Sequence, residues 1–410
     1  MYRGVMHRTV IRVLARVLLA AAVLYVFIGH SRNIRANVGR RDSIEYWTVS
    51  RLLLHRQNPY DIDHIFEVER GHGYKEDQPL VLLTPPWSLF MILPLGIMSP
   101  LWGWALWLAI SVGALIVSMR LCWRIYGRSG VPQNLFWVAG YLFAPVPACL
   151  VAAQMGLVLL LGLVFFLLLE RDHPFLAGAA LVLPFAKPHL LALFWIVLFL
   201  WVLTRRKLAL AAGFATAFAL ALVIPLLFDP AIFHHYRAML PQAAVDHMFI
   251  PALSGVLRAL FFHRHFWVQF LPMVLGVTWC VWFFAKHRAN WIWREHGLPL
   301  LVVSVLTTPY AWLTDEVVLL PAILQAAVWL YEARESTTVM TRVSIGLFAL
   351  LNALLLFILS FKIPFATGIY FWSSLVWLGW YFYARNRVRM LQAGTSHAYA
   401  GRIAGWDTCQ

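Results

Sequence analysis

Charged side chains are scarce in this sequence of 410 residues. Asp, Glu, Lys and Arg together make up 12% of it, whereas a soluble domain contains about 25% of these residues. Hydrophobic residues make up 61%, and the mean hydropathy is positive. This composition excludes a soluble globular domain and predicts an integral membrane protein.

Acidic residues are the scarcer charged type, with 18 of them against 33 Lys and Arg. Most of the excess positive charge lies in short connections between apolar runs, which is the pattern that the positive-inside rule describes. The formal net charge of +15 is therefore no indication of nucleic-acid binding.

Cysteine pairs and metal-ligand clusters are lacking as well. The four cysteines show no paired spacing, so we expect neither a disulfide framework nor a zinc site; they are Cys122, Cys149, Cys280 and Cys409. His234-His235 and His263-x-His265 resemble metal spacings only superficially, and we interpret them as loop histidines. The sequence predicts no metal site and no cofactor.

Thirteen apolar runs follow one another along the chain, and a helix needs about 20 residues to cross a bilayer. The runs lie near residues 12–30, 82–98, 101–121, 134–151, 154–169, 174–187, 189–204, 208–228, 266–285, 298–313, 316–331, 343–361 and 368–384. The first follows a basic N-terminus and ends in Gly29-His30-Ser31-Arg32 rather than in a small-x-small cleavage motif. We interpret it as an uncleaved anchor.

Basic connections limit the number of crossings. Those that the positive-inside rule assigns to the cytoplasm contain Arg120, Arg124 and Arg128; Arg205-Arg206-Lys207; Lys286-His287-Arg288; Arg334 and Arg342; and Arg385, Arg387 and Arg389. If the N-terminus is cytoplasmic, all of these connections can lie on the cytoplasmic side only if one of the early apolar runs does not cross the membrane. The run 82–98 carries Pro85, Pro86 and Pro94, so we take it as re-entrant or surface-lying. The prediction is an all-α polytopic membrane protein of about 12 transmembrane helices, with both termini in the cytoplasm.

Polar residues gather on the outer side of this topology. The first outer loop, residues 31–80, holds eight of the 18 acidic residues, and a second outer loop covers 229–265. Short outer connections carry Gln154, Lys187-Pro188-His189, Thr314-Asp315-Glu316 and Lys362. Residues 1–390 would then form a single transmembrane domain, and 391–410 a disordered cytoplasmic tail.

Asp42 in the first outer loop has two interpretations. A helix starting at Ser43 would carry a polar side and suit a position on the membrane surface. That polar side would consist of Thr48, Arg51 and His55. Asp42 would cap this helix, with Glu45 completing a capping box. Alternatively, a carboxylate facing water at the foot of a bundle is suited to chemistry on a lipid-borne substrate. Spacing alone leaves both interpretations open.

Two cations are candidates for holding a phosphate. Lys187 follows an apolar run, and a cation near membrane depth tends to be functional, although snorkelling to the interface explains it equally well. Arg258, in the second outer loop, is the other candidate. Asn58-Pro59-Tyr60-Asp61 predicts a turn, because Pro presets φ while Asn and Asp favour turn positions.

The motifs occur in a recognisable order. After the first apolar run come Asp42, Tyr46, Pro59-Tyr60-Asp61, Pro85-Pro86-Trp87, Gln154-x-Gly156, Lys187-Pro188 and Thr308-Pro309-Tyr310-Ala311-Trp312-Leu313-Thr314-Asp315. This order resembles glycosyltransferase family 87 of the GT-C superfamily over residues 12 to 385. The resemblance implies a GT-C-type bundle that transfers sugars from polyprenyl phosphates, as mycobacterial polyprenol-phosphate-mannose-dependent α-mannosyltransferases do.

Position by position, the resemblance implies that Asp42 is the catalytic base. It also implies that Lys187 lies on the side where the donor phosphate is held. The segment from Thr308 to Trp312 matches a late Ser-Pro-x-x-Trp element, which Asp-His-His follows in many members. This chain has Leu-Thr-Asp-Glu there, so Asp315 is at most a substitute for such a histidine.

We therefore hypothesise a multi-pass glycosyltransferase of the cell (cytoplasmic) membrane. It would move a hexose, mannose by the resemblance, from polyprenyl phosphate to a lipid or glycan acceptor at the periplasmic, extracytoplasmic face. A sugar phosphoester brings its own leaving group, so the enzyme needs a base and cations and works with inversion. The residues expected around the substrates are Tyr46, Tyr60, Asp61, Gln154, Lys187, His189, Arg258 and Asp315.

A transporter or flippase for a lipid-linked sugar or another solute is the alternative. It would favour charges at mid-membrane and inverted repeats, whereas here the ionisable residues gather on the outer side. A non-catalytic membrane assembly subunit is a third interpretation, under which no single outer acidic residue matters.

Overall fold

The computed structural model describes residues 42–128, 130–243, 248–262, 264–333, 339–360 and 370–404. These residues form helices and no strands, so the prediction of an all-α protein is confirmed for them. The first apolar run and Lys362 lie outside the described residues.

Five described helices are long and apolar enough to cross a membrane, or six if one bent pair counts as a single span. They are α5 (Pro100–Tyr126), η4 with α10 (Pro188–Arg205), α11 (Leu208–Phe228), η6 with α14 and η7 (Phe266–Asn290), and η8 with α16 (Leu313–Glu332). The bent pair consists of α6 (Gln133–Tyr141) and α7 (Pro145–Ala152), which meet at 50°. A membrane protein is thereby supported, and the total of twelve crossings stays a prediction.

The other described helices lie between these spans or at the ends and edge of the bundle. They are α3 (Asp42–Leu54), α4 (Ile62–Gly71), η1 (Pro86–Met91), η2 (Leu93–Ile97), α8 (Gly156–Leu169), α9 (Pro174–Ala180), η3 (Pro184–Ala186), α12 (Ile232–Met239), α13 (Leu253–Phe261), α15 (Trp293–Thr307), α17 (Val339–Ser360) and α19 (Ser373–Ala404). Three of them, η1, α9 and η3, begin at a proline, and η2 has one at its second position; proline fits the first turn of a helix but lacks the N–H that continues one. The run 82–98 accordingly folds as η1 and η2, and neither is long enough to cross a bilayer.

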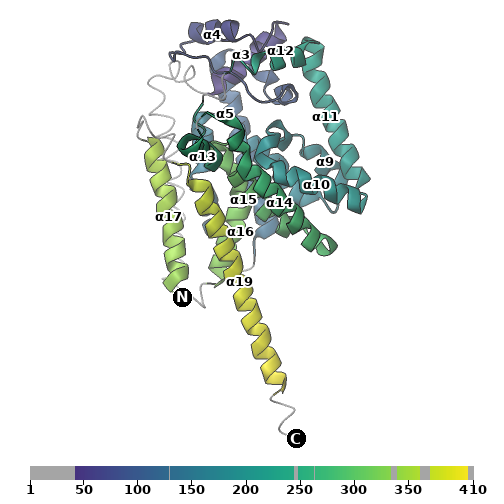
Figure 1. The fold of residues 1–410 in the computed structure, drawn as a ribbon, viewed down its shortest axis with the longest axis vertical. Coiled ribbons are helices and arrows are strands. Elements are labelled where there is room, and N and C mark those ends of the chain that lie inside the picture. Colours follow the sequence, from purple (N-terminus) through teal and green to yellow (C-terminus); the bar gives the residue numbers. More distant parts are fainter. Residues whose placement is uncertain are drawn as a thin grey trace, which may run out of the picture.

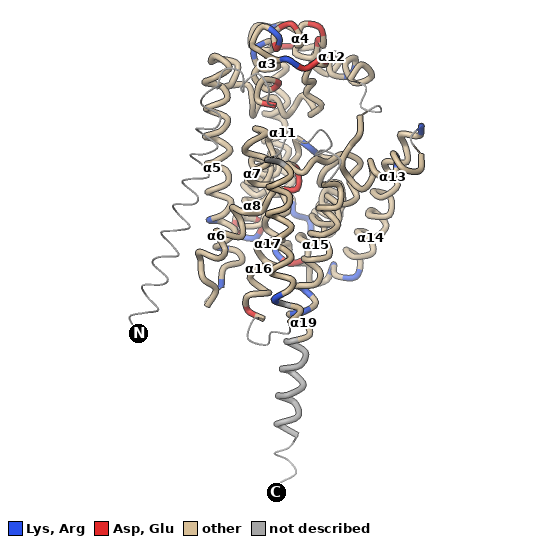
Figure 2. Tube along the Cα trace, turned by 90° about the vertical axis from the view of Figure 1, so that its left-hand side faces the viewer, with Lys and Arg blue, Asp and Glu red and all other residues tan. Residues whose placement is uncertain are grey.

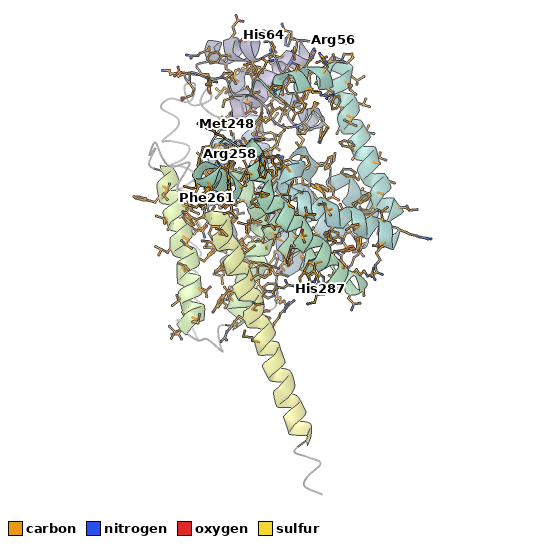
Figure 3. All side chains as sticks on the ribbon, viewed as in Figure 1. Arg56, His64, Met248, Arg258, Phe261 and His287 are labelled. Carbon is orange, nitrogen blue, oxygen red and sulfur yellow. The ribbon has the colours of Figure 1, made fainter. Side chains whose placement is uncertain are left out.

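The two ends of the bundle differ in charge. Helices α3, α4 and α12 lie together at one end, and α19 extends beyond the opposite end (Figure 1). Acidic residues gather at the end with α3 and α4, while many Lys and Arg lie toward the other (Figure 2). Arg56 and His64 of the first loop lie at the former end, and His287 lies toward the latter (Figure 3). This agrees with their expected positions on opposite sides, and which end faces outward stays a prediction.

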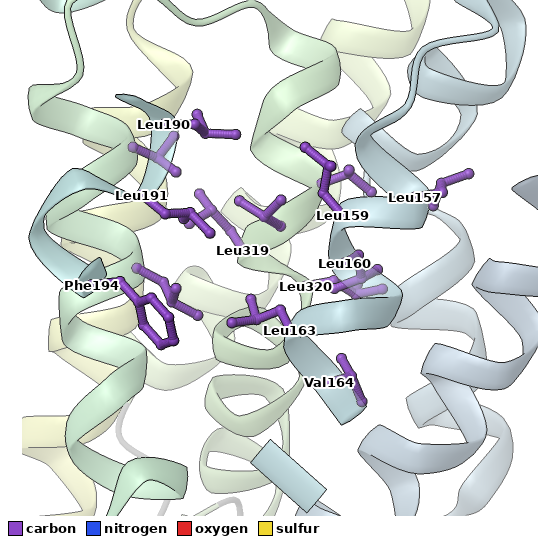
Figure 4. Close-up of a cluster of buried hydrophobic side chains, with 14 of the residues drawn as sticks. Leu157, Leu159, Leu160, Leu163, Val164, Leu190, Leu191, Phe194, Leu319 and Leu320 are labelled. Atoms are coloured by element: carbon purple, nitrogen blue, oxygen red, sulfur yellow. The ribbon is translucent and has the colours of Figure 1, made fainter. Parts of the chain in front are cut away.

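The hydrophobic core lies where α8, the η4–α10 segment and the η8–α16 segment meet. Leu160 and Leu163 of α8, Leu191 and Phe194 from η4 and α10, and Leu320 of α16 pack together there (Figure 4). All are fully buried. Gln154, Lys187 and Asp315 lie within two residues of the starts of these three segments, so the core fixes the relative positions of these polar residues.

Helix α3 does not have the polar side that its sequence predicts. Thr48 is fully buried while Arg51 is exposed, because η2 and α5 pack closely against α3. The neighbouring helix α4 is the two-sided one in this loop, with only Ile65 and Glu69 buried. A position on the membrane surface therefore suits α4 better than α3.

The disordered tail expected from residue 391 stays a prediction. Helix α19 continues as far as Ala404, past residue 391, where we expect the ordered domain to end. Residues 405–410 lie outside the described residues.

Helices α9 and α11 pack closely together at glycines. This close packing predicts which glycine substitution destabilises the protein. A Cβ atom at Gly213 would clash with the Phe175 carbonyl oxygen, whereas one at Gly346 of α17 would meet nothing within 4 Å. Gly213→Ala should therefore destabilise the protein by about 1–3 kcal/mol through overpacking, and Gly346→Ala should not. Thermal unfolding in detergent measures both; equal melting temperatures for the two variants would contradict the packing argument.

Candidate active site

Gln154 is placed by a sharp break between two helices. Helix α7 ends at Ala153 in the left-handed conformation (φ 59°), which costs free energy in a residue other than glycine. The indole Nε1 of Trp107 donates a hydrogen bond of 2.7 Å to the Ala153 carbonyl and stabilises the turn. As a result, Gln154 lies in the short connection before α8 with its side chain available for long-range contacts.

The Gln154 carboxamide joins side chains from two distant segments. Its Nε2 donates to Oδ2 of Asp42 at the start of α3. Its Oε1 accepts hydrogen bonds of 3.3 Å from the Tyr46 hydroxyl and 3.3 Å from Lys187 Nζ. The structure thus brings together Asp42, Tyr46, Gln154 and Lys187, which the sequence analysis names separately.

Lys187 forms an ion pair with Asp315. The Nζ to Oδ1 distance is 2.7 Å, and both residues are buried, at 7% and 0% exposure. The second Asp315 oxygen accepts from the backbone N–H of Trp312 at 3.0 Å. A buried charge is stable only when it is paired and hydrogen-bonded. This ion pair therefore explains how a lysine is accommodated directly before the apolar η4–α10 segment.

Gly156 explains why the Gln-x-Gly motif requires a glycine. A Cβ atom there would lie 2.7 Å from Val317 Cγ1 and 2.8 Å from the Thr314 carbonyl oxygen. The start of α8 therefore packs directly on η8, the segment that carries Asp315. This close approach brings Gln154 and Asp315 to the same lysine.

We call Asp42, Tyr46, Gln154, Lys187 and Asp315 together the polar group. The late Thr-Pro-Tyr element lies beside it. Thr308 Oγ1 donates a hydrogen bond of 3.1 Å to the His189 carbonyl, and the His189 and Tyr310 rings meet edge to face at 5.8 Å. The Nε2 atom of His189 is buried and has no hydrogen-bond partner among the described residues. His189 thus lies beside the polar group and adds an unused donor or acceptor there.

Arg258 lies on the far side of this turn. Helix α13 is joined to the turn by Ser254, whose Oγ donates to the Thr308 carbonyl at 2.8 Å. The Arg258 guanidinium donates to the Met248 carbonyl at 2.6 Å and lies over the Phe266 ring at 5.4 Å. Arg258 and Met248 are neighbours in Figure 3. Arg258 is thus a buried cation on α13, the helix that is joined to this turn.

Tyr60 and Asp61 occupy the predicted turn. The Asn58 side chain accepts from Tyr60 N at 2.9 Å, and Asp61 caps α4 by accepting from His64 N at 3.1 Å. Asp61 is exposed, whereas Tyr60 is buried against Tyr236. The described contacts of these two residues are structural, and a role in binding substrate stays a prediction.

Two glutamates near Asp42 were not singled out from the sequence as members of the site. Burial, followed by the charges of Asp42 and Glu69, raises the pKa of Glu45 well above its usual value, while Lys187 opposes the shift. Burial raises the pKa of Glu69 to about 7, although a hydrogen bond from Leu80 N lowers it. Its position four residues after Ile65, on the buried side of α4, is the sequence signal that reveals it.

The polar group therefore contains the Asp42 carboxylate, the Tyr46 hydroxyl, the Gln154 carboxamide, and the Lys187 ammonium paired with the Asp315 carboxylate. Within the described ranges, no group of three or more His, Cys, Asp or Glu is arranged to hold a metal ion. The arrangement can accept a proton at Asp42 and stabilise negative charge at Lys187. These are the two functions that transfer from a phosphoester requires.

The fold and this site define a helical membrane protein with a buried Lys187–Asp315 ion pair where helices are interrupted. The model of glycosyltransferase family 87 matches residues 83–353. The chain belongs to glycosyltransferase family 87, and a GT-C fold is consistent with that match. The matched range contains Gln154, Lys187, Arg258 and Asp315, while Asp42 precedes it. Comparisons with curated proteins and with solved structures found no match.

Glu69 gives a prediction for the pH dependence of stability. Its folded pKa of about 7 exceeds that of an unfolded glutamate, so the folded protein binds more protons between these values and stability falls as pH rises through them. Glu69→Gln should remove this loss. The melting temperature of wild type relative to Glu69→Gln should drop between about pH 5 and about pH 8.

The matched control is Glu67→Gln, because Glu67 is exposed on the same helix. Its melting temperature should follow that of wild type across the pH range. Parallel curves for wild type and Glu69→Gln would contradict the assignment of Glu69 as the titrating group.

Proposed function

We propose that this member of family 87 transfers a hexose from a polyprenyl-phosphate donor to a lipid or glycan acceptor, with Asp42 as the general base. Mannose is the sugar that the resemblance to mannosyltransferases favours. The reaction would occur at the outer face of the cytoplasmic membrane. Family membership supports the transferase activity; the donor, the acceptor, the face and the base belong to the proposal.

One observation carries it. Asp42 and Lys187, 145 positions apart, bind the same carboxamide of Gln154. A base and a cation therefore lie about two hydrogen bonds apart, close enough for one to face the acceptor hydroxyl and the other the leaving phosphate on opposite sides of one anomeric carbon.

The proposed reaction is a single displacement. Asp42 accepts the proton from the acceptor hydroxyl as its oxygen forms a bond to the anomeric carbon. The bond between that carbon and the phosphate oxygen breaks, and the electron pair leaves with polyprenyl phosphate. Attack opposite the leaving group inverts the anomeric centre.

Lys187 would stabilise the departing phosphate. An ammonium has three N–H donors, of which one meets Asp315 and one meets Gln154. The third can bind a phosphate oxygen while the other two keep the lysine in place. Asp315 then acts as a positioning residue through Lys187, rather than as a replacement for a histidine.

The remaining residues have supporting roles in this proposal. The Tyr46 hydroxyl holds Gln154 in the orientation that presents its amide N–H groups to Asp42. His189 and Tyr310 line the Lys187 side, and Arg258 would provide a second cation for the phosphate. Tyr60 and Asp61 shape the first loop around the acceptor.

The direct test is donor consumption. Purified full-length protein is incubated with labelled polyprenyl-phosphate mannose and a mixture of membrane lipids. Transfer yields a labelled product and free polyprenyl phosphate. A flippase or an assembly subunit would leave the donor intact, and an intact donor under conditions where the protein is folded would overturn the proposal.

Asp42→Asn should abolish transfer, because an amide of the same shape cannot accept the proton. General-base catalysis contributes about 10²–10⁴-fold to the rate, so the loss should fall in that range or beyond it. Turnover measured with saturating donor checks this. Asp63→Asn, at an exposed acid of the same loop, is the control, and equal turnover in the two variants would exclude Asp42 as base.

Lys187→Met should lower turnover more than Asp315→Asn does. Methionine removes the cation, whereas asparagine keeps a hydrogen-bond acceptor for Lys187 and only loosens its position. Lys75→Met, in the first loop and exposed, should retain wild-type activity. If Asp315→Asn were the more damaging change, Asp315 rather than Lys187 would contact the reacting atoms.

A further inference from the structure

A cleft away from the polar group opens between α3, α4 and the start of α5. It has a volume of about 600 Å³, and its lining includes the basic side chains Arg51, His55 and His72. Its remaining wall is largely apolar and includes Met98 and Pro100. We propose that this cleft binds the phosphate of an anionic membrane phospholipid, with one acyl chain lying along α5.

The charge of the cleft supports an anionic ligand. No acidic residue is among the described residues that line it, although the first outer loop holds eight of the 18 acids in the sequence. This basic cleft within an acidic loop selects against cations and in favour of a phosphate.

The three side chains are held in place by the backbone. Arg51 Nη1 donates to the Gly96 carbonyl at 3.2 Å, which leaves other N–H groups of the guanidinium for a bidentate phosphate contact. His55 and His72 each use Nδ1 on a carbonyl of their own helix, both at 2.8 Å. Their Nε2 atoms are therefore the ring positions left for a ligand, and they donate to a phosphate oxygen when the ring is doubly protonated.

Trp47 adds an interfacial element to the cleft. Its ring lies 4.7 Å from that of His72, and its Nε1 donates to the Met98 carbonyl at 2.9 Å. An indole with a bonded N–H and an apolar face is typical of the depth at which lipid headgroups meet acyl chains.

An apolar groove lies on the helix that begins at the cleft. Pro100, the first residue of α5, lines the cleft, and a groove of about 430 Å³ on the same helix is lined by Leu101, Trp104, Leu108 and Val112 among others. Helix α5 is a candidate membrane span, so the groove runs along the direction of the acyl chains. A basic cleft followed by an apolar groove has the charge and polarity order of a phospholipid.

The ligand is distinct from the sugar donor. Arg51 follows Asp42 by nine residues on α3, and at 1.5 Å per residue it lies about 13 Å farther along the axis. The reacting carbon of a sugar phosphoester is bonded to the phosphate oxygen, so a donor phosphate at Arg51 could not react beside Asp42. The inference therefore does not depend on the proposed transfer reaction.

The test measures lipid binding to the purified full-length protein in detergent, by native mass spectrometry or fluorescence titration. Dioleoyl phosphatidylglycerol should bind at least tenfold more tightly than dioleoyl phosphatidylcholine. Arg51→Gln combined with His72→Gln should remove this preference. Arg120→Gln, an exposed arginine near the other end of α5, should retain it.

Two further measurements distinguish binding of free phosphate from binding of lipid, and the contribution of the headgroup from that of the acyl chains. Inorganic phosphate at millimolar concentration should not displace the dioleoyl lipid. Ala109→Trp, which fills the groove from an exposed position, should weaken the dioleoyl lipid at least fivefold and leave dihexanoyl phosphatidylglycerol unchanged. Unaltered selectivity in the Arg51/His72 variant, efficient competition by phosphate, or no dependence on chain length would overturn the proposal. Unchanged melting temperatures establish that each variant is folded.

Discussion

The buried ion pair between Lys187 and Asp315 is the constraint on which the rest of this site depends. An ammonium in an apolar interior has a desolvation cost that only a close, fully hydrogen-bonded partner offsets. The partner comes from a segment 128 positions away and is itself held by the Trp312 amide. Three helix starts must therefore meet at one point, and the leucine-rich core below them fixes that meeting point. The geometry of the candidate site and the folding of the chain are thus governed by the same contacts.

Interrupted helices make this convergence possible. A continuous span presents only side chains at membrane depth, whereas a break exposes backbone groups that must be satisfied within the protein. The Trp107 indole satisfies the Ala153 carbonyl and the Thr308 hydroxyl satisfies the His189 carbonyl, while each adjoining proline has no N–H to satisfy. The polar residues can then leave the helix surface and face one another. This arrangement explains why several apolar runs in the sequence are too short to cross a membrane.

Much of the architecture follows from local patterns, and the site follows only in part. Hydropathy identifies α5 and α11 because a spanning helix is a property of consecutive residues, and proline explains the shortness of η1 and η2. The motif order indicates Asp42, Gln154 and Lys187 as functional. No local pattern encodes that Gln154 touches the other two, since pairing across more than 30 residues depends on packing. Thr48 shows the same limit, because η2 buries a residue that helical periodicity places on the outside.

The acid next to Asp315 carries a consequence for how the chain is assembled. Glu316 is buried and turns away from Lys187; it accepts hydrogen bonds from Ser373 at 2.5 Å and from Trp377 at 2.9 Å. Both donors belong to α19, the last of the described helices. Until that helix has been synthesised and has packed, η8 would hold an acid without these partners, which is costly in an apolar environment. We therefore expect the segment that bears Asp315 to reach its final position only after α19 has packed against it, so that α19 acts as a checkpoint on assembly of the candidate site.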